Sequence, residues 1–276
     1  MPKPKDIPFS RMGNISGSGI FIKRFGQFGK TAMKDYAHRD DYYIFVLLTA
    51  GSAVVEIDFE RKELAAGDAL IISPWQVHGK PAGEVWDADG WMLAVSPELL
   101  SEADARAIDE YSLSPQPFRP DADVAADITA LCPMIERHGG NDSVVAAMAA
   151  AVKSMALSSL PASVAGAPGR YRSITVSFRK LLDSHLDRQK SPAAYAAMLR
   201  ISEVYLNEAV KGATGLSAGA YIRRRVVIQA KRQLAYTSLS AKEIAFALGY
   251  EDYAYFSRLF RKETSVSPSD YRKNLD

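Results

Sequence analysis

The sequence predicts an α+β fold, in which a small β-barrel with flanking helices precedes an all-α domain. Two observations predict this order: residues 20–95 hold short apolar runs separated by glycine and aspartate turns, and residues 170–276 hold apolar residues at helical spacing. A third is charge. Residues 170–276 carry 19 Lys and Arg against 10 Asp and Glu, whereas the net charge of the whole chain is only +2. A compact basic domain is typical of proteins that bind a polyanion.

Length and composition suit two domains of ordinary size, because the chain has 276 residues, of which 47% are hydrophobic. Cys132 is the only cysteine, so no internal disulfide can form. No apolar run reaches the ~18 residues that a membrane span needs. The N-terminus lacks the apolar segment of a secretory signal. We therefore expect a cytoplasmic protein without a membrane partner.

Four segments are expected along the chain. They are an N-terminal arm (1–19), the barrel domain (20–160), a small uncharged linker (161–169) and the helical domain (170–276). The strands of the barrel are predicted at 20–22, 42–49, 53–59, 69–72 and 91–95. Helices are predicted at 97–111, 121–138 and 142–157. The last two helices either cover their own barrel or pack against a twin subunit.

The C-terminal domain contains a helix-turn-helix pattern. Ser240 and Glu243 predict a capping box at the start of a short helix, and Gly249 supplies the positive φ of a tight turn. The helix that follows is predicted to bury Phe256, Leu259 and Phe260. Its opposite side is polar and basic, which suits the major groove of DNA. The alternative is that its arginines only solvate an exposed face.

A similar layout occurs earlier in the chain, with a short helix over Ala193–Leu199 and a turn at Arg200. The buried side of its second helix is Leu206, Ala209 and Val210. Between the two units, a helix is predicted for 218–236. Its 19 residues would span roughly 28 Å, close to the ~34 Å between successive major-groove faces. The sequence therefore predicts two DNA-reading helices joined by one long helix.

The candidate DNA contacts lie on the unburied sides of these helices. The residues predicted to read base edges are Tyr253, Ala254, Ser257 and Arg258 in the second unit, and Val204, Asn207 and Glu208 in the first. Arginine suits guanine, asparagine adenine, and glutamate cytosine. The residues predicted to hold phosphates are Lys211, Arg261 and Lys262, with residues 223–225 as further candidates.

The segment LAYTSLSAKEIAFALGYEDYAYFSRLFRKETSVSPSDYRK resembles the C-terminal signature of the AraC/XylS family of transcriptional regulators. The resemblance covers roughly residues 170–273. It implies sequence-specific binding to double-stranded DNA, a homodimer, and RNA polymerase as a further partner. Two residues depart from the pattern: Ser265 replaces the usual glycine after the recognition helix, and Arg200 stands where the second unit has Gly249.

The segment HRDDYYIFVLLTAGSAVVEIDFERKELAAGDALIISPWQVH resembles the cupin-type ligand-binding domain that precedes the DNA-binding half in this family. It implies that a small-molecule effector binds in a cupin-like barrel. The candidate pocket residues are polar and aromatic, namely Arg24, His38, Tyr43, Phe45, Trp75, His78 and Trp91. The alternative for each aromatic residue is that it only fills the barrel.

Metal-binding cupins use two neighbouring histidines, a glutamate and a later histidine. Here His38 is followed by Arg39 and Asp40, so the second histidine is missing, although His78 matches the later one. The sequence therefore predicts no metal, no cofactor and no catalytic residue. Two alternatives from other classes stay open: a metal-dependent cupin enzyme that its C-terminal domain tethers to DNA, and an architectural DNA-binding protein with an inert barrel.

Overall fold

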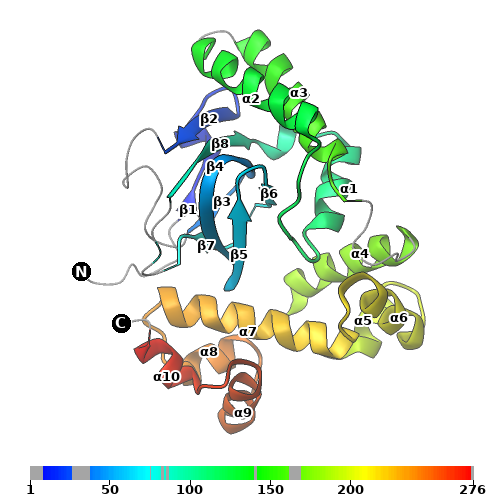
Figure 1. The fold of residues 1–276 in the computed structure, drawn as a ribbon. Helices are drawn as coiled ribbons and strands as arrows, with labels where there is room; N and C mark the ends of the chain where they lie inside the picture. Colours follow the sequence, from blue (N-terminus) through cyan, green and yellow to red (C-terminus); the bar gives the residue numbers. More distant parts are fainter. Residues whose placement is uncertain are drawn as a thin grey trace. The chain divides into compact units, whose positions relative to one another are not determined.

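The computed structural model describes residues 9–26, 38–74, 76–81, 84, 87–139, 142–161 and 169–274. The chain divides into two compact units, Pro8–Ser163 and Val164–Asp276 (Figure 1). Strands occur in the first unit and the second is all-helical, so the predicted α+β class is confirmed. Most of the predicted linker, 162–168, lies outside the described residues.

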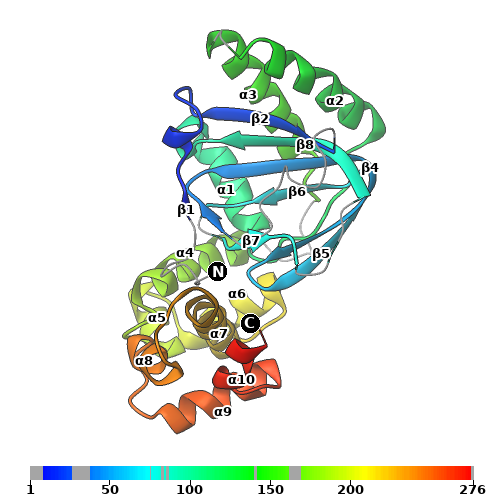
Figure 2. The same ribbon diagram turned by 90° about the vertical axis from the view of Figure 1, so that its left-hand side faces the viewer.

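One curved sheet forms the centre of the first unit (Figure 2). The strands of this unit are β1 (Phe9–Ser10), β2 (Ile20–Phe25), β3 (Arg39–Asp40), β4 (Tyr43–Ile57), β5 (Glu60–Ala65), β6 (Ala69–Ile72), β7 (His78–Gly79) and β8 (Asp87–Val95). The sheet runs β2-β8-β4-β5, and β6 and β7 also pair with β4. Among the described residues no pairing closes it into a complete barrel.

Strand β4 is longer than expected, because the predicted strands 42–49 and 53–59 are one strand of 15 residues. Gly51 lies between the two predicted strands. Its φ is +71°, and a Cβ there would lie 1.7 Å from the backbone oxygen of Asp87, so this glycine lets β8 approach a bent strand. The chain instead reverses at Asp58 and Phe59, both at positive φ, and continues as β5, which the sequence analysis missed.

Residues 9–19, which fall in the predicted N-terminal arm, form regular structure, and residues 1–8 of that arm lie outside the described residues. Strand β1 pairs in parallel with β3, and a short 3-10 helix follows at Met12–Asn14. The side chain of Met12 is buried, and its backbone N–H donates to Asp41 Oδ1 at 2.7 Å. This anchor explains the difference, because a single apolar side chain carries no periodicity that a sequence pattern can detect.

Three helices complete the first unit: α1 (Glu102–Tyr111), α2 (Ala122–Arg137) and α3 (Asp142–Ser158). Helix α1 starts later than predicted because Ser101 and Asp104 form its capping box, and a separate 3-10 turn precedes it at Pro97–Leu99. Helices α2 and α3 pack on each other and share one apolar cluster with the sheet residues Phe45 and Trp91. They therefore cover a face of their own sheet.

The two faces of β4 belong to two different cores, because side chains alternate along a strand. Phe45 and Leu47 join the cluster under the helices, whereas Ile44 and Leu48 join a second cluster on the concave face. A β-bulge between Leu48 and Ala50 shifts the alternation. This parity decides which residues of the first unit can line a cavity.

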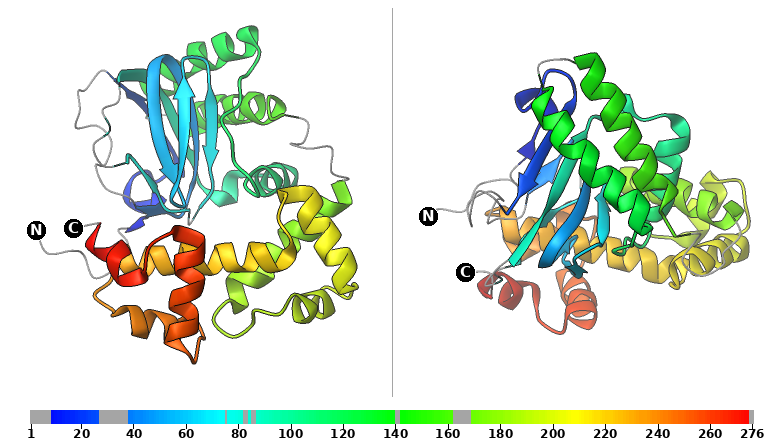
Figure 3. Two further views of the ribbon diagram at one scale, coloured as in Figure 1. Left: turned by 60° about the horizontal axis from the view of Figure 1, so that its bottom comes forward. Right: turned by 45° about the horizontal axis from the view of Figure 1, so that its top comes forward.

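The second unit contains seven helices in the described part of the chain. They are α4 (Gly169–His185), α5 (Pro192–Met198), α6 (Glu203–Thr214), α7 (Ala218–Tyr236), α8 (Ala241–Ala247), α9 (Tyr253–Thr264) and α10 (Pro268–Lys273). Helix α7 is a central rod: α5 and α6 pack near its start, and α8, α9 and α10 pack near its end (Figure 3). One core unites them, with Phe178, Tyr195 and Phe256 completely buried.

Candidate nucleic-acid interface and ligand cavity

Both helix-turn-helix units have the same backbone hydrogen bonds in their turns. In the second helix-turn-helix unit, Gly249 N–H donates to Phe246 O, and Tyr250 N–H donates to Ala245 O. In the first helix-turn-helix unit, the N–H groups of Arg200 and Ile201 make the equivalent two bonds. Arg200 has a φ of +57° and Gly249 a φ of +77°, so both turns need the left-handed conformation that glycine favours. The tandem repeat predicted from the sequence is present in the fold.

The second helix of each unit buries the predicted side. Phe256, Leu259 and Phe260 of α9 are buried, as are Leu206, Ala209 and Val210 of α6. A side-chain cap fixes the start of each helix: Asp252 Oδ1 accepts from Ala254 N–H at 2.7 Å, and Ser202 Oγ accepts from Tyr205 N–H at 3.1 Å. The opposite sides are therefore held toward solvent in a defined orientation.

The predicted base readers of α9 lie on its open side. Ala254 and Arg258 are exposed, and Ser257 is half-buried. Tyr253 is also half-buried and packs against the domain core, so less of its surface is open. An exposed aromatic residue that the sequence analysis missed is Tyr255, of which 52% is accessible. Tyr255 directly follows the predicted base reader Ala254, and this position could have identified it from the sequence.

The predicted readers of α6 differ from one another in exposure. Val204 is 69% exposed, which is unusual for an apolar residue on an otherwise well-packed helix, and Glu208 is exposed too. Asn207 is half-buried, and its Oδ1 accepts a hydrogen bond from the backbone N–H of Ala218 at 3.0 Å. This bond helps to cap α7, so the side chain of Asn207 joins two helices.

The predicted phosphate contacts, Lys211, Arg261 and Lys262, are all exposed. Each lies in the last turn of its helix. Basic residues of α7 are engaged within the protein, because Arg225 pairs with Asp183 at 2.5 Å and Arg223 with Glu263 at 3.6 Å. Arg223 and Arg225 are thus each paired with an acidic side chain, whereas Lys211, Arg261 and Lys262 are exposed.

A cavity of about 300 Å³ lies on the concave face of the sheet in the first unit. Most of its lining is apolar, and the polar atoms come from few side chains. The lining residues are Ile15, Phe21, Lys23, Phe25, His38, Asp40, Tyr42, Ile44, Val46, Leu48, Ala53, Val55, Ile72, His78, Gly79 and Met92. His38 and His78 are the predicted pocket residues among them.

Four other predicted pocket residues, Arg24, Tyr43, Phe45 and Trp91, are not among the residues that line this cavity. Phe45, Trp91 and Tyr43 belong to or pack against the cluster under the helices, on the opposite face of the sheet. Arg24 is held by Asp89, with 3.1 and 2.6 Å between their nitrogen and oxygen atoms. This bond keeps the pKa of Asp89 below its usual range. Trp75 lies outside the described residues.

The alternation of side chains along the strands explains why these residues lie outside the cavity. His38, Asp40 and the residues at 42, 44, 46 and 48 share one face, so the even positions line the cavity and the odd positions meet the helices. The same rule places Phe21 and Met92 in the cavity and Trp91 outside it. The alternation was visible in the sequence, but the aromatic residues were chosen without it.

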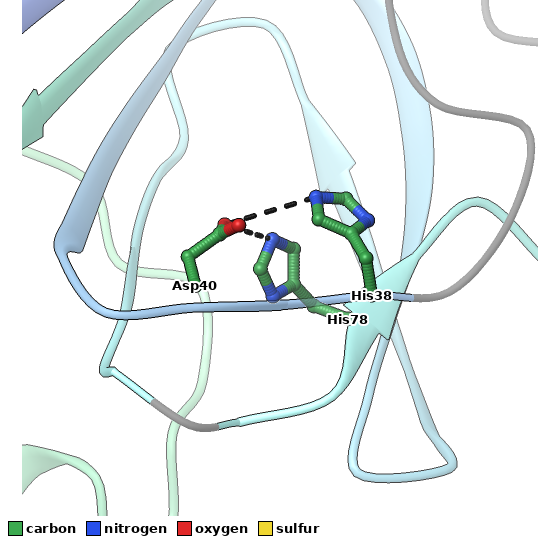
Figure 4. A group of neighbouring side chains, drawn as sticks. All are labelled: His38, Asp40 and His78. Atoms are coloured by element: carbon green, nitrogen blue, oxygen red, sulfur yellow. Dashed lines mark ion pairs between the residues drawn. The ribbon is translucent and has the colours of Figure 1, made fainter. Parts of the chain in front are cut away.

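His38, Asp40 and His78 form a compact cluster in the cavity wall (Figure 4). His78 Nε2 lies 3.2 Å and His38 Nε2 lies 3.7 Å from Asp40 Oδ2. The imidazole rings are tilted, with 4.4 Å between their centroids. Burial and the nearby charge of Asp40 raise the pKa of Tyr42, which lines the same cavity.

Two family models match the chain: an AraC-like ligand binding domain at residues 25–150 and a helix-turn-helix domain at residues 195–274. The regulatory protein SoxS of Salmonella typhimurium is 35% identical over 94 residues, which are 34% of this chain and 88% of SoxS. The HTH-type transcriptional activator RhaS of Yersinia pestis is 39% identical over 70 residues, which are 25% of this chain and 26% of RhaS.

Solved structures are similar to part of the chain as well. The C-terminal domain of AraT, a response regulator from Geobacillus stearothermophilus, is 30% identical. It covers 37% of this chain and 84% of its own, with a TM-score of 0.36. In the described parts of the chain, no helix combines the length and apolar character required to cross a membrane.

Proposed function

We propose, because the chain belongs to the AraC family of transcription regulators, that it binds double-stranded DNA sequence-specifically through α6 and α9. The observation that carries this proposal is the placement of two capped helices, each with an open side, near opposite ends of α7. The 19 residues of α7 span roughly 28 Å. That length suits two successive major-groove segments, ~34 Å apart.

The roles of individual residues follow from exposure and chemistry. In α9, Arg258 pairs with guanine, while Ala254 and Ser257 contact neighbouring base edges, and Tyr253 contributes its exposed part. In α6, Val204 packs on a thymine methyl group and Glu208 accepts from cytosine. The residues that hold phosphates are Lys211, Arg261 and Lys262.

Asn207 has a different role in this proposal. Its bond to Ala218 N–H supports a positioning function, in which Asn207 keeps α6 in a fixed orientation on α7. The first helix-turn-helix unit then reads DNA with an exposed valine and an acidic residue. Its helix α6 attracts phosphates less strongly than α9 does. We expect the half-element read by α6 to be the more degenerate of the two.

The cavity of the first unit is the proposed effector site. Its volume of about 300 Å³ and its apolar lining suit a small, largely apolar compound with a polar end that faces His38, Asp40 and His78. Binding there regulates DNA binding without a catalytic step, in an assembly that includes a homodimer and RNA polymerase. Exposed apolar side chains on α2 and α3, Met134 and Val144, support a surface for the second copy.

The DNA proposal is tested by selection from a random duplex pool with the full-length protein at fixed salt. We expect an enriched motif with two half-elements about one helical turn apart. Binding that salt weakens uniformly, with no enriched motif, would mean that only phosphates are contacted. That result would favour an architectural role or a tethered enzyme.

The effector proposal is tested by a thermal-shift screen of small apolar acids and phenols. The cavity-filling variant Val46→Phe should lose the shift that a hit produces in the natural protein. The matched control is Tyr43→Phe. Tyr43 lies on the same strand but packs on the helix-covered face, so this variant should keep the shift. Equal loss in both variants would argue against this cavity as the effector site.

A further inference from the structure

The cluster of His38, Asp40 and His78 has a geometry that the proposed function does not require. Each residue offers one ligand atom, and these atoms lie within 4.8 Å of one another. All three side chains are buried, with 9%, 1% and 5% of their residue surfaces accessible, respectively. A buried carboxylate between two imidazoles is costly unless a positive charge compensates it.

The hydrogen bond on the far side of His78 limits how its ring can meet Asp40. His78 Nδ1 lies 3.1 Å from the backbone oxygen of Gln76, which can only accept, so Nδ1 carries the proton. In the neutral ring Nε2 then has a lone pair, and it points at Asp40 Oδ2 from 3.2 Å. Two acceptors at this distance repel each other unless a cation or a further proton lies between them.

The separations between the ligand atoms also suit a shared metal ion. Ligand atoms about 2.0–2.2 Å from a metal lie roughly 3.0–3.5 Å apart in octahedral or tetrahedral geometry. The two Nε2–Oδ2 distances of 3.2 and 3.7 Å are close to that range. A histidine that donates its other ring N–H to a backbone carbonyl is the usual outer support of a metal ligand.

We propose that His38, Asp40 and His78 bind one divalent first-row transition-metal ion, of the Zn²⁺ or Fe²⁺ class, in the wall of the cavity. Two imidazoles and one carboxylate suit these ions and leave coordination positions open. The sequence predicts no metal because the second histidine is absent, but Asp40 stands at that position and would supply a ligand. The same three residues line the cavity, so a metal held by them would lie at its wall.

This arrangement narrows the class of effector, a step that rests on the proposed function of the cavity. A metal with open positions binds an anionic oxygen donor, such as a carboxylate or an enolate, while the apolar wall holds the rest of the compound. The metal proposal itself stands without an effector and is tested without one.

The test uses tag-free, full-length protein that has been treated with a chelator and dialysed. Zn²⁺ and, without oxygen, Fe²⁺ are added separately, and bound metal is measured after gel filtration by mass spectrometry. Co²⁺ serves as a spectroscopic probe, because its visible absorption reports coordination by nitrogen and oxygen. We expect one ion per chain. Bound metal well below one equivalent for every ion, with no Co²⁺ spectrum, would overturn the proposal.

Variants locate the site. Asp40→Asn and His78→Ala should each weaken metal binding by at least about tenfold. The matched controls are His138→Ala and His185→Ala, which change the two histidines outside the cluster and should bind as the natural protein does. Equal weakening in the controls would place the metal elsewhere and overturn the assignment.

DNA binding separates this proposal from the regulatory one. Asp40→Asn should select the same DNA motif as the natural protein, which also shows that the variant is folded. A variant that loses metal but keeps the motif supports the site. Metal bound at the cluster without any selected DNA motif would support the metal site and refute the regulatory function. A selected DNA motif without bound metal would support the regulatory function and refute the metal site.

Discussion

Gly249 and Asp187 are in direct backbone contact: a Cβ built on Gly249 would lie 1.7 Å from the carbonyl oxygen of Asp187. Asp187 precedes α5, so the turn of the second helix-turn-helix unit packs on the entrance to the first. Lys190, from the same entrance, places its Nζ 4.7 Å from the centre of the Tyr250 ring. The two units are therefore fixed to each other beyond their common contact with α7.

The first prediction concerns this contact. Gly249→Ala should destabilise the helical domain by at least about 2 kcal/mol, because it combines a left-handed φ with a clash against backbone. Urea unfolding of the full-length protein, followed by circular dichroism, measures the change. Gly215→Ala is the matched control, since its φ of +75° is similar but nothing lies within 4 Å of the added Cβ.

Gly215→Ala should cost only about 1 kcal/mol, the strain of a left-handed non-glycine residue. The difference between the two variants isolates the clash with Asp187. Equal destabilisation would mean that the backbone contact is relieved by a small shift and does not fix the two units.

Ser265→Gly should stabilise the protein. Ser265 ends α9 with a φ of +66° and donates its N–H to Arg261 O at 2.8 Å, in a position that Gly215 occupies at the end of α6. Removing Cβ relieves about 1 kcal/mol of strain, part of which the greater freedom of the unfolded chain offsets. The unfolding midpoint in urea should rise. A lower midpoint would show that the Ser265 side chain stabilises the folded protein by more than its backbone strain costs.

Arg258→Ala and Arg261→Ala should affect DNA binding in different ways. Loss of Arg258 should weaken binding to the selected motif by about 1–3 kcal/mol and relax the preference at one base position. Loss of Arg261 should weaken binding to all duplexes alike and reduce the salt dependence by about one phosphate contact. Fluorescence anisotropy at several salt concentrations distinguishes the two; identical effects would reject the assignment of Arg258 as a base reader.

The ion pair between Lys153 and Asp104 makes stability depend on pH. Their atoms are 2.5 Å apart, and Lys153 is buried. Burial alone would raise the pKa of Asp104, but hydrogen bonds from Lys153 and Ser101 outweigh it and hold the pKa below 3.8.

Lys153→Met should therefore cost about 1–3 kcal/mol at pH 7. Because the folded-state pKa is lowered, the pair stabilises above the unfolded-state value and its contribution is lost as the pH falls through the folded-state value. Urea unfolding at several pH values should show the gap between natural protein and variant narrowing below about pH 4. A gap independent of pH would assign the loss to packing of the lysine stem.

The helical domain was predictable in detail because its signals are local. Capping residues, a glycine turn and apolar residues at helical spacing specify each unit within about ten residues. Gly249 shows the limit of such signals. Its positive φ follows from the turn, whereas its contact with Asp187 depends on packing between segments far apart in sequence.

The sheet was predicted less well because its pairing is nonlocal. Gly51 carries the signal of a turn, but it permits close approach by β8, and only the fold shows which applies. The cavity residues were separable by strand parity, yet aromatic character favoured Phe45 and Trp91. The cluster of His38, Asp40 and His78 needs the β-bridge between residues 38 and 78, which no local pattern reveals.

The alternation of β4 also matters for protein engineering. Ile44 and Val46 form the cavity wall, while Phe45 and Leu47 between them hold α2 and α3 in place. A combinatorial library at the cavity positions thus changes the chemical space that the cavity accepts and leaves the helix-facing residues untouched. The strand provides a fixed template from which biosensors for chosen compounds can be selected, with the DNA-binding half unchanged as the reporter.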